Sequence, residues 1–245
     1  MRNIRIHVDD SLGAGAELVL PPQAGAHIAR VLRLRAGDPL TLFNGDGRDY
    51  AAELTIAGPR EVRVRVLQAQ PNLSESPLRI VLAQALARGE KMDWIVQKAT
   101  ELGVAAIVPL VTARSEVKLD EGRARKRLEH WRAVAINACE QSGRARVPVI
   151  APVQGLQEWL PSLDAGAAAT RLALLPEGEA TARQLRGIQD TAVLAIGPEG
   201  GLDEKDSALL REAGFKGLRL GPRVLRTETA GISAIAALQA LYGDF

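Results

Sequence analysis

Residues 192–203 read AVLAIGPEGGLD, an apolar run that passes through a glycine-rich turn into a polar segment. The run from Ala192 to Ile196 has the length and composition of a buried strand. The glycines of the turn let the backbone approach a ligand without a Cβ in the way, and Asp203 suits the N-cap of a helix over residues 204–213. Ligands of open α/β sheets bind outside the carboxyl ends of the strands. The segment therefore predicts a parallel sheet with a ligand site at that edge.

Taken alone, this turn is most simply interpreted as a tight connection between a strand and a helix. It is neither the GxGxxG dinucleotide fingerprint nor a Walker loop, which requires Gly-Lys-Ser/Thr. A second segment, residues 218–230, reads LRLGPRVLRTETA and changes that interpretation. Two Gly-Pro turns that follow two strands of one sheet would meet at a common edge. The triplet Arg226, Thr227 and Glu228 opens the last helix there, either as the mouth of a ligand cleft or as an ordinary salt-bridged helix start.

The rest of the carboxyl-terminal part alternates strands with amphipathic helices. Strands are predicted over residues 78–86, 104–111, 147–151, 171–175 and 191–196, and helices over residues 90–102, 121–141 and 204–213. Gly103 stands where a helix cap belongs. This alternation predicts a mostly parallel sheet that is covered by helices on both faces.

The amino-terminal part has a different pattern, with short alternating runs separated by turn signals. Five strands are predicted over residues 4–8, 17–20, 39–43, 50–56 and 61–66, which indicates a small β-barrel, and a short helix is predicted over residues 26–34. The polar, proline-bracketed segment 71–77 is typical of a linker. We therefore expect a barrel domain over residues 1–72 and an α/β domain over residues 73–245.

Composition narrows the classes of function. The 245 residues carry a net charge of only +2 and 3% aromatic residues, so any contact with RNA must depend on Arg and Lys, with Phe43 or Tyr50 as stacking side chains. The single cysteine excludes an internal disulfide, and charged residues at the start argue against a signal peptide. No apolar stretch reaches the roughly 18 residues of a membrane helix. A cytoplasmic location without a membrane role is expected.

The two glycine turns together carry a specific resemblance. Residues 196–202 and 220–230 resemble the paired cofactor loops of the 16S ribosomal RNA uridine N3-methyltransferases, the ribosomal RNA small subunit methyltransferase E family of the SPOUT class. The resemblance extends in order over nearly the whole chain, through residues 27–38, 97–103, 109–115 and 138–144. Ile4 and Ile6 depart from it where aromatic residues are common, and Asp203 and Asp206 where Ser and Glu are common.

The resemblance implies a PUA-like, RNA-binding barrel followed by an α/β domain with a deep trefoil knot, active as a homodimer. The knot rests on the resemblance alone, because threaded chains are very rare. The implied cofactor is S-adenosylmethionine, and the implied reaction is methylation of N3 of a uridine in 16S ribosomal RNA of the small subunit. The residues implied at the cofactor are Leu175, Gly197, Glu199, Gly200, Gly201, Leu220, Gly221, Leu225, Arg226 and Thr227.

Methyl transfer to N3 of uridine requires positioning of the reactants and removal of the N3 proton, and needs no metal. Arg226 is our candidate for stabilising charge on the uracil oxygens, and Glu228 for the base. Cys139 lies on the apolar side of a predicted helix, so a buried structural thiol is preferred over a nucleophile. The three histidines lie far apart in sequence, which gives a zinc site almost no support.

RNA contact is assigned to arginines and lysines that could follow a phosphate backbone. These residues are Arg30, Arg33, Arg35, Arg88, Lys91, Arg114 and Arg144. The basic run 123–127 is interpreted as a solvated helix face. The last helix is apolar around most of its circumference over residues 231–241, which a partner subunit would cover.

Two other functions remain open. One is a non-catalytic RNA-binding factor of ribosome assembly, which would not need the small-molecule pocket that the two turns suggest. The other is a nucleotide-binding oxidoreductase, which lacks its fingerprint.

Overall fold

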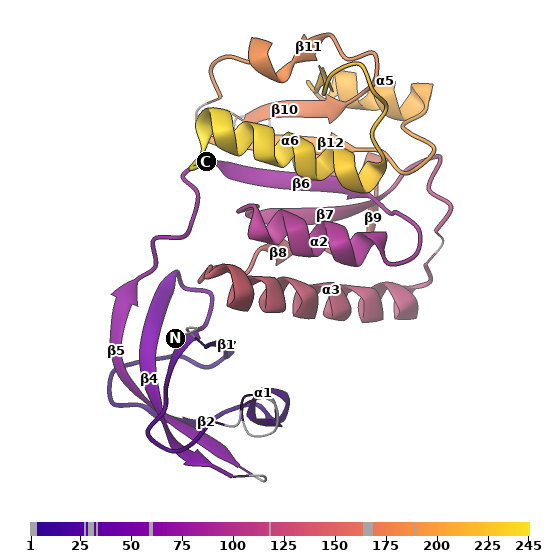
Figure 1. The fold of residues 1–245 in the computed structure, drawn as a ribbon. Coiled ribbons are helices and arrows are strands. Elements are labelled where there is room, and N and C mark those ends of the chain that lie inside the picture. The colour runs from indigo at the N-terminus through magenta and orange to yellow at the C-terminus, as the bar shows by residue number, and fades with distance from the viewer. Residues whose placement is uncertain are drawn as a thin grey trace. The chain divides into compact units, whose positions relative to one another are not determined.

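The computed structural model describes residues 4–26, 28, 32, 34–58, 61–117, 119–163, 169–188 and 190–245. The chain divides into two compact units. The first comprises Met1–Glu75 together with Cys139–Val147, and the second comprises Ser76–Ala138 and Pro148–Phe245. Figure 1 labels most of the helices and strands of both units. The sequence pattern did not indicate that residues 139–147 belong to the first unit.

The first unit contains a five-stranded sheet in the order β1-β3-β4-β5-β2. Its strands are β1 (Arg5–His7), β2 (Glu17–Val19), β3 (Pro39–Phe43), β4 (Arg48–Ala57) and β5 (Val62–Pro71). β1 pairs with β3 in parallel and the other pairs are antiparallel. Leu42, Leu54 and Val64 are buried inside it, which accounts for the alternating apolar residues of these runs.

The five predicted strands of this unit are confirmed. Part of the predicted helix is confirmed, because Ala26 ends α1 (Pro22–Ala26) and Ile28 and Leu32 are also helical. Most of the predicted range, residues 27, 29–31 and 33, lies outside the described residues.

A polar network holds residues 139–147 within the first unit. Arg5 is buried, donates two hydrogen bonds of 2.8 Å to the carboxylate of Asp49, and donates one of 3.1 Å to the carbonyl oxygen of Arg144. Arg144 is also buried, and its Nη2 lies 2.8 Å from Oε2 of Glu75. Cys139 is buried beside them, and burial raises the pKa of its thiol to about 12. The prediction of a structural thiol is confirmed.

The second unit contains a parallel sheet in the order β11-β13-β10-β12-β6-β7-β8, with β9 paired to β7. Its strands are β6 (Arg79–Ala85), β7 (Ala106–Val111), β8 (Val149–Ile150), β9 (Gln154–Gly155), β10 (Ala169–Leu174), β11 (Ala180–Thr181), β12 (Thr191–Ile196) and β13 (Lys216–Arg219). The parallel sheet and its longer strands are confirmed. The two-residue strands β9 and β11 were not predicted, because they are too short to show a periodic pattern.

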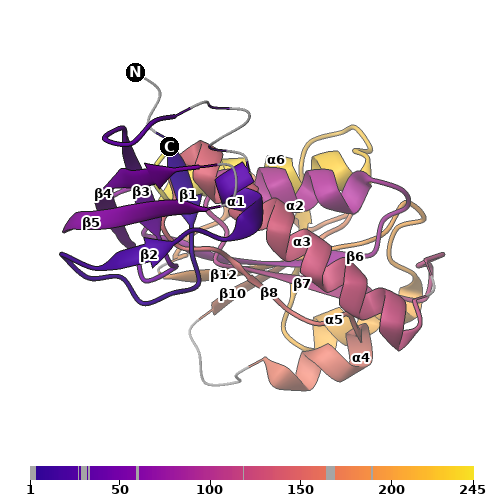
Figure 2. The same cartoon turned by 90° about the horizontal axis from the view of Figure 1, so that it is seen from below.

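Helices cover both faces of this sheet, as predicted. Figure 2 shows α2 (Lys91–Glu101), α3 (Glu121–Ser142) and α6 (Thr227–Tyr242) on one face, and α4 (Leu156–Trp159) and α5 (Glu204–Glu212) on the other. Two short 3-10 turns, Leu160–Ser162 and Ala182–Gln184, complete the unit. Gly103 follows α2 with a φ of +84°, which confirms its place at the end of that helix.

The helix α6 packs closely on the sheet at Gly231. A Cβ on Gly231 would lie 3.4 Å from Oε1 of Gln84 and 3.6 Å from Cγ1 of Ile196. The helix therefore lies directly over the carboxyl ends of β6 and β12. The start of α6 is thereby fixed at the edge of the sheet where the site is predicted. The trefoil knot implied for this unit stays a prediction.

Candidate active site

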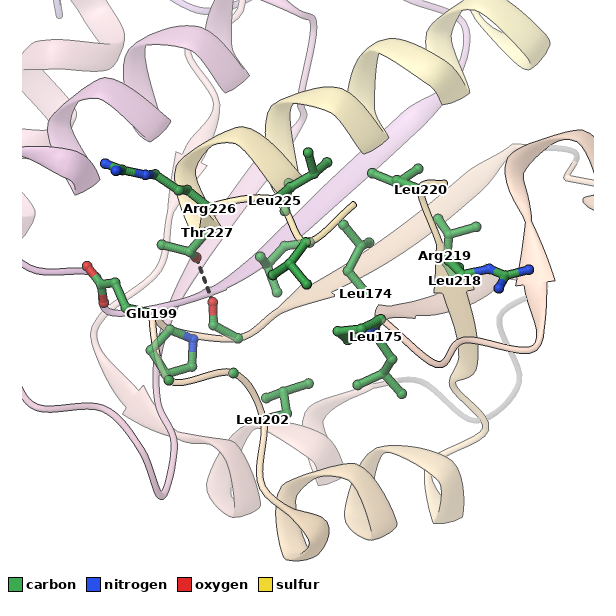
Figure 3. A pocket seen from close by; sticks show the side chains of 18 of the residues that line it. Leu174, Leu175, Glu199, Leu202, Leu218, Arg219, Leu220, Leu225, Arg226 and Thr227 are labelled. Atoms are coloured by element: carbon green, nitrogen blue, oxygen red, sulfur yellow. Dashed lines mark hydrogen bonds between the residues drawn. The ribbon is translucent and has the colours of Figure 1, made fainter. Parts of the chain in front are cut away.

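A cavity of about 720 Å³ opens at the carboxyl ends of β10, β12 and β13. This is the edge at which the sequence predicted a ligand site, and the volume is ordinary for a pocket that binds a small molecule. The turn after β12 forms one side of the cavity and the turn after β13 forms another (Figure 3). The ten residues proposed to contact a cofactor all line it.

The cavity has an apolar interior and charged residues around it. Figure 3 shows Leu174, Leu175, Leu202, Leu220 and Leu225 gathered around its centre. Seven charged residues also line it: Lys91, Arg114, Glu177, Glu199, Arg219, Arg223 and Arg226. Five cations against two carboxylates give the region a positive balance, which favours an anionic partner.

A buried hydrogen-bonded chain joins the two turns. Thr227, the first residue of α6, donates from Oγ1 to the carbonyl oxygen of Gly197 at 2.6 Å (Figure 3). Gln84, at the end of β6, donates from Nε2 to the same Oγ1 at 2.9 Å and to the carbonyl oxygen of Ala85 at 3.0 Å. Gln84 and Thr227 are both buried. Because buried hydrogen bonds are costly to break, this chain fixes the distance between the first turn and the start of α6.

The first turn is also restricted by the packing of its own backbone. A Cβ on Gly197 would lie 2.9 Å from the amide nitrogen of Leu202, closer than real Cβ contacts come. The helix α5 then begins as predicted, because Asp203 is its N-cap and the carboxylate of Asp203 accepts a hydrogen bond from the backbone N–H of Asp206. The glycine at 197 is therefore needed for the shape of the turn itself.

A lysine joins the first turn to α6 through two carboxylates. Nζ of Lys91 donates to Oε1 of Glu199 at 2.9 Å and lies 3.4 Å from Oε2 of Glu228. Oε1 of Glu199 also accepts a hydrogen bond of 3.0 Å from the backbone N–H of Arg88. Burial raises the pKa of Glu199, but the hydrogen bonds from Lys91 and Arg88 outweigh burial and hold that pKa below its ordinary value. The hydrogen bond to Glu199 raises the pKa of Lys91, so this lysine stays charged.

The two proposed catalytic residues lie differently with respect to the cavity. Arg226 is an exposed residue that lines it, and Figure 3 shows its side chain directed away from the leucines. Glu228 is the second residue of α6, is paired with Lys91 and is not among the lining residues. This arrangement suits Arg226 to a ligand that approaches from outside and places Glu228 behind Lys91.

The strand β7 is followed by a loop that covers the first turn. Nη1 of Arg114 donates to the carbonyl oxygen of Gly200 at 2.8 Å, and Oδ2 of Asp206 accepts a hydrogen bond of 3.1 Å from the backbone N–H of Ala113. Asp206 is buried, and burial raises its pKa. The Asp at 206 therefore holds the loop that carries Arg114 against the start of α5.

Comparison with known proteins agrees with this geometry. Residues 74–239 match the family described as RNA methyltransferase domain, and residues 20–67 match the RNA methyltransferase PUA domain. The ribosomal RNA small subunit methyltransferase E of Mycobacterium bovis is 35% identical over 240 residues, which cover 96% of this chain and 90% of that protein. The chain belongs to the ribosomal RNA small subunit methyltransferase E family.

Two solved structures of this kind contain a ligand. A putative methyltransferase from Legionella pneumophila, in complex with the bound cofactor SAM, is 40% identical with a TM-score of 0.94, and the match covers 100% of both chains. The ribosomal RNA small subunit methyltransferase E of Neisseria gonorrhoeae, bound to S-adenosyl methionine, is 38% identical with a TM-score of 0.92 over 100% of both chains. These similarities confirm the α/β fold with its amino-terminal PUA-like domain.

Three of the residues assigned to RNA contact gather beside the cavity. Lys91 and Arg114 line it, and Arg88 contributes the backbone N–H that binds Glu199 and pairs its side chain with Glu116. Arg35 is an exposed residue of the first unit. Arg30 and Arg33 lie outside the described residues.

Three residues of the first unit do not fit the roles considered for them. Arg144 is 3% exposed and its guanidinium is paired with Glu75, so it holds this unit together and is not placed to bind phosphate. Phe43 and Tyr50, considered as stacking platforms, are also buried. Sequence composition cannot distinguish a buried arginine or aromatic residue from an exposed one, which is why these interpretations failed.

Gln84 and Asp206 were not predicted as site residues from the sequence. Gln84 is the polar residue in the apolar run of β6, and a buried amide in such a strand is a signal that could have been followed. Asp206 was noted only as a departure from the family pattern.

In the described part of the chain, no helix is long and apolar enough to span a membrane. In that part too, no three His, Cys, Asp or Glu side chains are grouped as metal ligands.

Proposed function

We propose that the cavity binds S-adenosylmethionine and that this chain methylates N3 of a uridine in 16S ribosomal RNA. The observation that carries the proposal is the convergence of two glycine turns, joined by Thr227, on one cavity at the carboxyl edge of the sheet. Membership of an RNA methyltransferase family and the ligand-bound relatives support it. When bound, S-adenosylmethionine supplies an electrophilic methyl carbon.

The residues present fit that cofactor. The cavity volume of about 720 Å³ falls within the range for small-molecule sites, which is roughly 300–1,000 Å³. Its leucines provide an apolar surface for a purine ring, and the two turns provide backbone N–H and C=O groups for polar substituents. Leu175, Gly197, Glu199, Gly200, Gly201, Leu220, Gly221, Leu225, Arg226 and Thr227 are the residues we propose for cofactor binding.

The chain's own side chains then have distinct roles toward the uridine. Arg226, at the mouth of the cavity, is placed to donate hydrogen bonds to a uracil oxygen as negative charge develops on the ring. Glu228 is our candidate for the group that accepts the N3 proton, with Lys91 holding its carboxylate. Because Glu228 is not a lining residue, the N3 proton would reach its carboxylate through a water molecule.

The partner that we propose is 16S ribosomal RNA, either free or in the small ribosomal subunit. The cations around the cavity attract a polyanion, and Arg35, Arg88, Lys91 and Arg114 are candidates for phosphate contacts. We also propose that residues 1–72 form an RNA-binding domain and that residues 73–245 form the catalytic domain. A cytoplasmic location is expected for an enzyme that acts on ribosomal RNA.

A homodimer is proposed from α6. Partly exposed Ile232, Ala236 and Ala237 and exposed Leu241 extend its apolar character beyond the face that packs on the sheet. A second copy of the chain could cover these residues. Light scattering at micromolar concentration should give the mass of a dimer, and the mass of a monomer would refute the proposal.

Isothermal titration calorimetry with S-adenosylhomocysteine tests the site. A Cβ on Gly200 would lie 3.4 Å from Cβ of Arg114, so in Gly200→Val the added methyl groups must crowd the mouth of the cavity. We expect the wild type to bind and Gly200→Val to lose most of its affinity. The matched control is Gly13→Val, because a Cβ at Gly13 meets nothing within 4 Å.

Absence of binding to the wild type would contradict the proposed function. Equal affinity of a folded Gly200→Val would remove this turn from the site. RNA binding by a wild type that neither binds S-adenosylhomocysteine nor methylates RNA would favour the non-catalytic assembly factor.

A further inference from the structure

We infer that the first half of α3 forms a phosphate-binding surface that holds the RNA substrate beside the cavity. This inference rests on the proposed function, because it concerns the path of the same RNA. The surface, which we call the α3 basic face, consists of Arg123, Arg125, Lys126, Arg127 and Arg132.

The α3 basic face is much more positively charged than the chain as a whole. Residues 123–132 contain five Lys or Arg side chains and one carboxylate, whereas the whole chain has a net charge of only +2. The excess of cations is therefore local. All five cations of the face are exposed, and Arg125, Lys126 and Arg127 can exchange their hydration for phosphate oxygens.

Most of these cations are not neutralised by neighbours. Arg123 is paired with Asp120, with Nε and Oδ2 3.3 Å apart. Across the residues that the structure describes, no carboxylate lies within ion-pair distance of Arg125, Lys126 or Arg127. Ordinary solvated helix faces combine charges of both signs in i,i+4 ion pairs. Glu121 and Glu129 have this spacing from Arg125, but in the described structure neither lies within ion-pair distance of it.

The face lies at the edge of the sheet where the cavity opens. A helix that follows a parallel strand begins at the carboxyl end of that strand, and α3 follows β7 through the loop that carries Arg114 (Figure 1). Arg114 lines the cavity and is bonded to the first turn. Arg114 at the cavity and the cations of the first half of α3 are thus joined by the loop after β7, at the same edge of the sheet.

An RNA strand fits this arrangement better than an acidic protein surface. A nucleotide whose base enters the cavity leaves its flanking phosphates outside, a few ångströms apart along a chain. A row of long, flexible cations without aromatic neighbours is suited to phosphates and carries no sequence information. The α3 basic face would therefore provide affinity and position, while the cavity selects the base.

The test neutralises Arg125 and Lys126 together, as Arg125→Gln with Lys126→Gln. The control neutralises Arg211 and Lys216, which are exposed cations at the opposite, amino-terminal edge of the sheet. Both double variants change the net charge equally. Binding to 16S ribosomal RNA and to small subunits that lack the modification is measured between low and high salt, together with methylation and S-adenosylhomocysteine affinity.

We expect the α3 variant to bind RNA more weakly and to show a shallower salt dependence, by about 0.7 to 0.9 in the logarithmic slope for each phosphate that the protein no longer neutralises. KM for RNA should rise, while kcat and cofactor affinity stay unchanged. The control variant should match the wild type. An α3 variant that keeps the wild-type slope and KM would overturn the inference and leave the proposed function intact.

Two further outcomes are informative. A wild type that binds no RNA would refute the proposed function itself. Weaker binding of the α3 variant to assembled subunits but not to free RNA would overturn the RNA contact, because the partner of the face would then be a ribosomal protein.

Discussion

The two turns around the cavity are built differently. The first turn is fixed from several sides, because Thr227 binds the carbonyl oxygen of Gly197, Lys91 binds Glu199 and Arg114 binds the carbonyl oxygen of Gly200. The second turn, residues 221–226, is exposed along most of its length, and Val224 is 83% exposed. The first turn is therefore suited to hold a cofactor of constant shape, and the second to adapt to an RNA that arrives from outside.

Loss of Arg226, at the end of the second turn, should have the largest effect. Arg226→Ala removes a cation from the mouth of the cavity, and removing one interaction with developing charge typically costs about a hundredfold or more in turnover. Cofactor affinity should fall less than the rate, because an interaction with developing charge is weak before the transition state. Glu228→Gln should lower the rate at neutral pH and partly recover at higher pH, where the uracil imide ionises without a base. Single-turnover methylation across pH with saturating cofactor measures both effects.

Arg223→Ala is the control for this experiment, because it removes a neighbouring exposed cation of the same turn. Equal reductions in rate for Arg223→Ala and Arg226→Ala would indicate general attraction of RNA rather than catalysis. A wild-type rate and pH profile in Glu228→Gln would make Glu228 a structural partner of Lys91.

Alanine substitutions at one glycine of each turn test the contrast in rigidity. Gly197→Ala places a Cβ 2.9 Å from the amide nitrogen of Leu202, and crowding of this kind costs about 1–3 kcal/mol. Where that cost falls on the cofactor-bound conformation of the turn, affinity decreases about 5- to 150-fold. Gly221 has a φ of +88° but open space around it, so Gly221→Ala meets only backbone strain, and an exposed turn can relax part of it. Titration with S-adenosylhomocysteine should show the larger decrease in affinity for Gly197→Ala.

Thermal unfolding of both variants is the control, since each must remain folded for the comparison to hold. If Gly221→Ala weakened binding more than Gly197→Ala, the second turn would be the more restricted of the two and the contrast would be reversed.

The sequence predicted the features that depend on neighbouring residues and missed those that depend on residues far apart in the chain. Local signals such as glycines after apolar strands, an Asp before a helix and the alternation of strands and helices predicted the parallel sheet and the lining of the cavity. Interactions between residues far apart in the chain were not predictable. Arg144 pairs with Glu75, 69 residues away, and Gln84 bonds Thr227, 143 residues away. The sequence does not show which distant residue a charged or amide side chain will contact once both are buried.

The smallest expected effect concerns Lys91 and the pH dependence of the first turn. The pKa of Glu199 is lowered in the folded protein, so its contribution to the turn is present above its ordinary pKa of 4.5 and is lost as the pH falls through the lowered value. Lys91→Met removes the hydrogen bond that opposes burial, so the pKa of Glu199 should rise and the turn should weaken at a higher pH than in the wild type.

Cofactor affinity measured from pH 7 downward checks this, with Lys205→Met, an exposed lysine of α5, as the control. The wild type and Lys205→Met should keep their affinity to a lower pH than Lys91→Met. Because Lys91 is solvent-accessible, water and salt weaken its ion pairs, and the difference should shrink further at high ionic strength. Superimposable pH profiles would show that the backbone N–H of Arg88 alone is sufficient to keep Glu199 ionised, and that the first turn owes its rigidity to Thr227 and to the packing of Gly197.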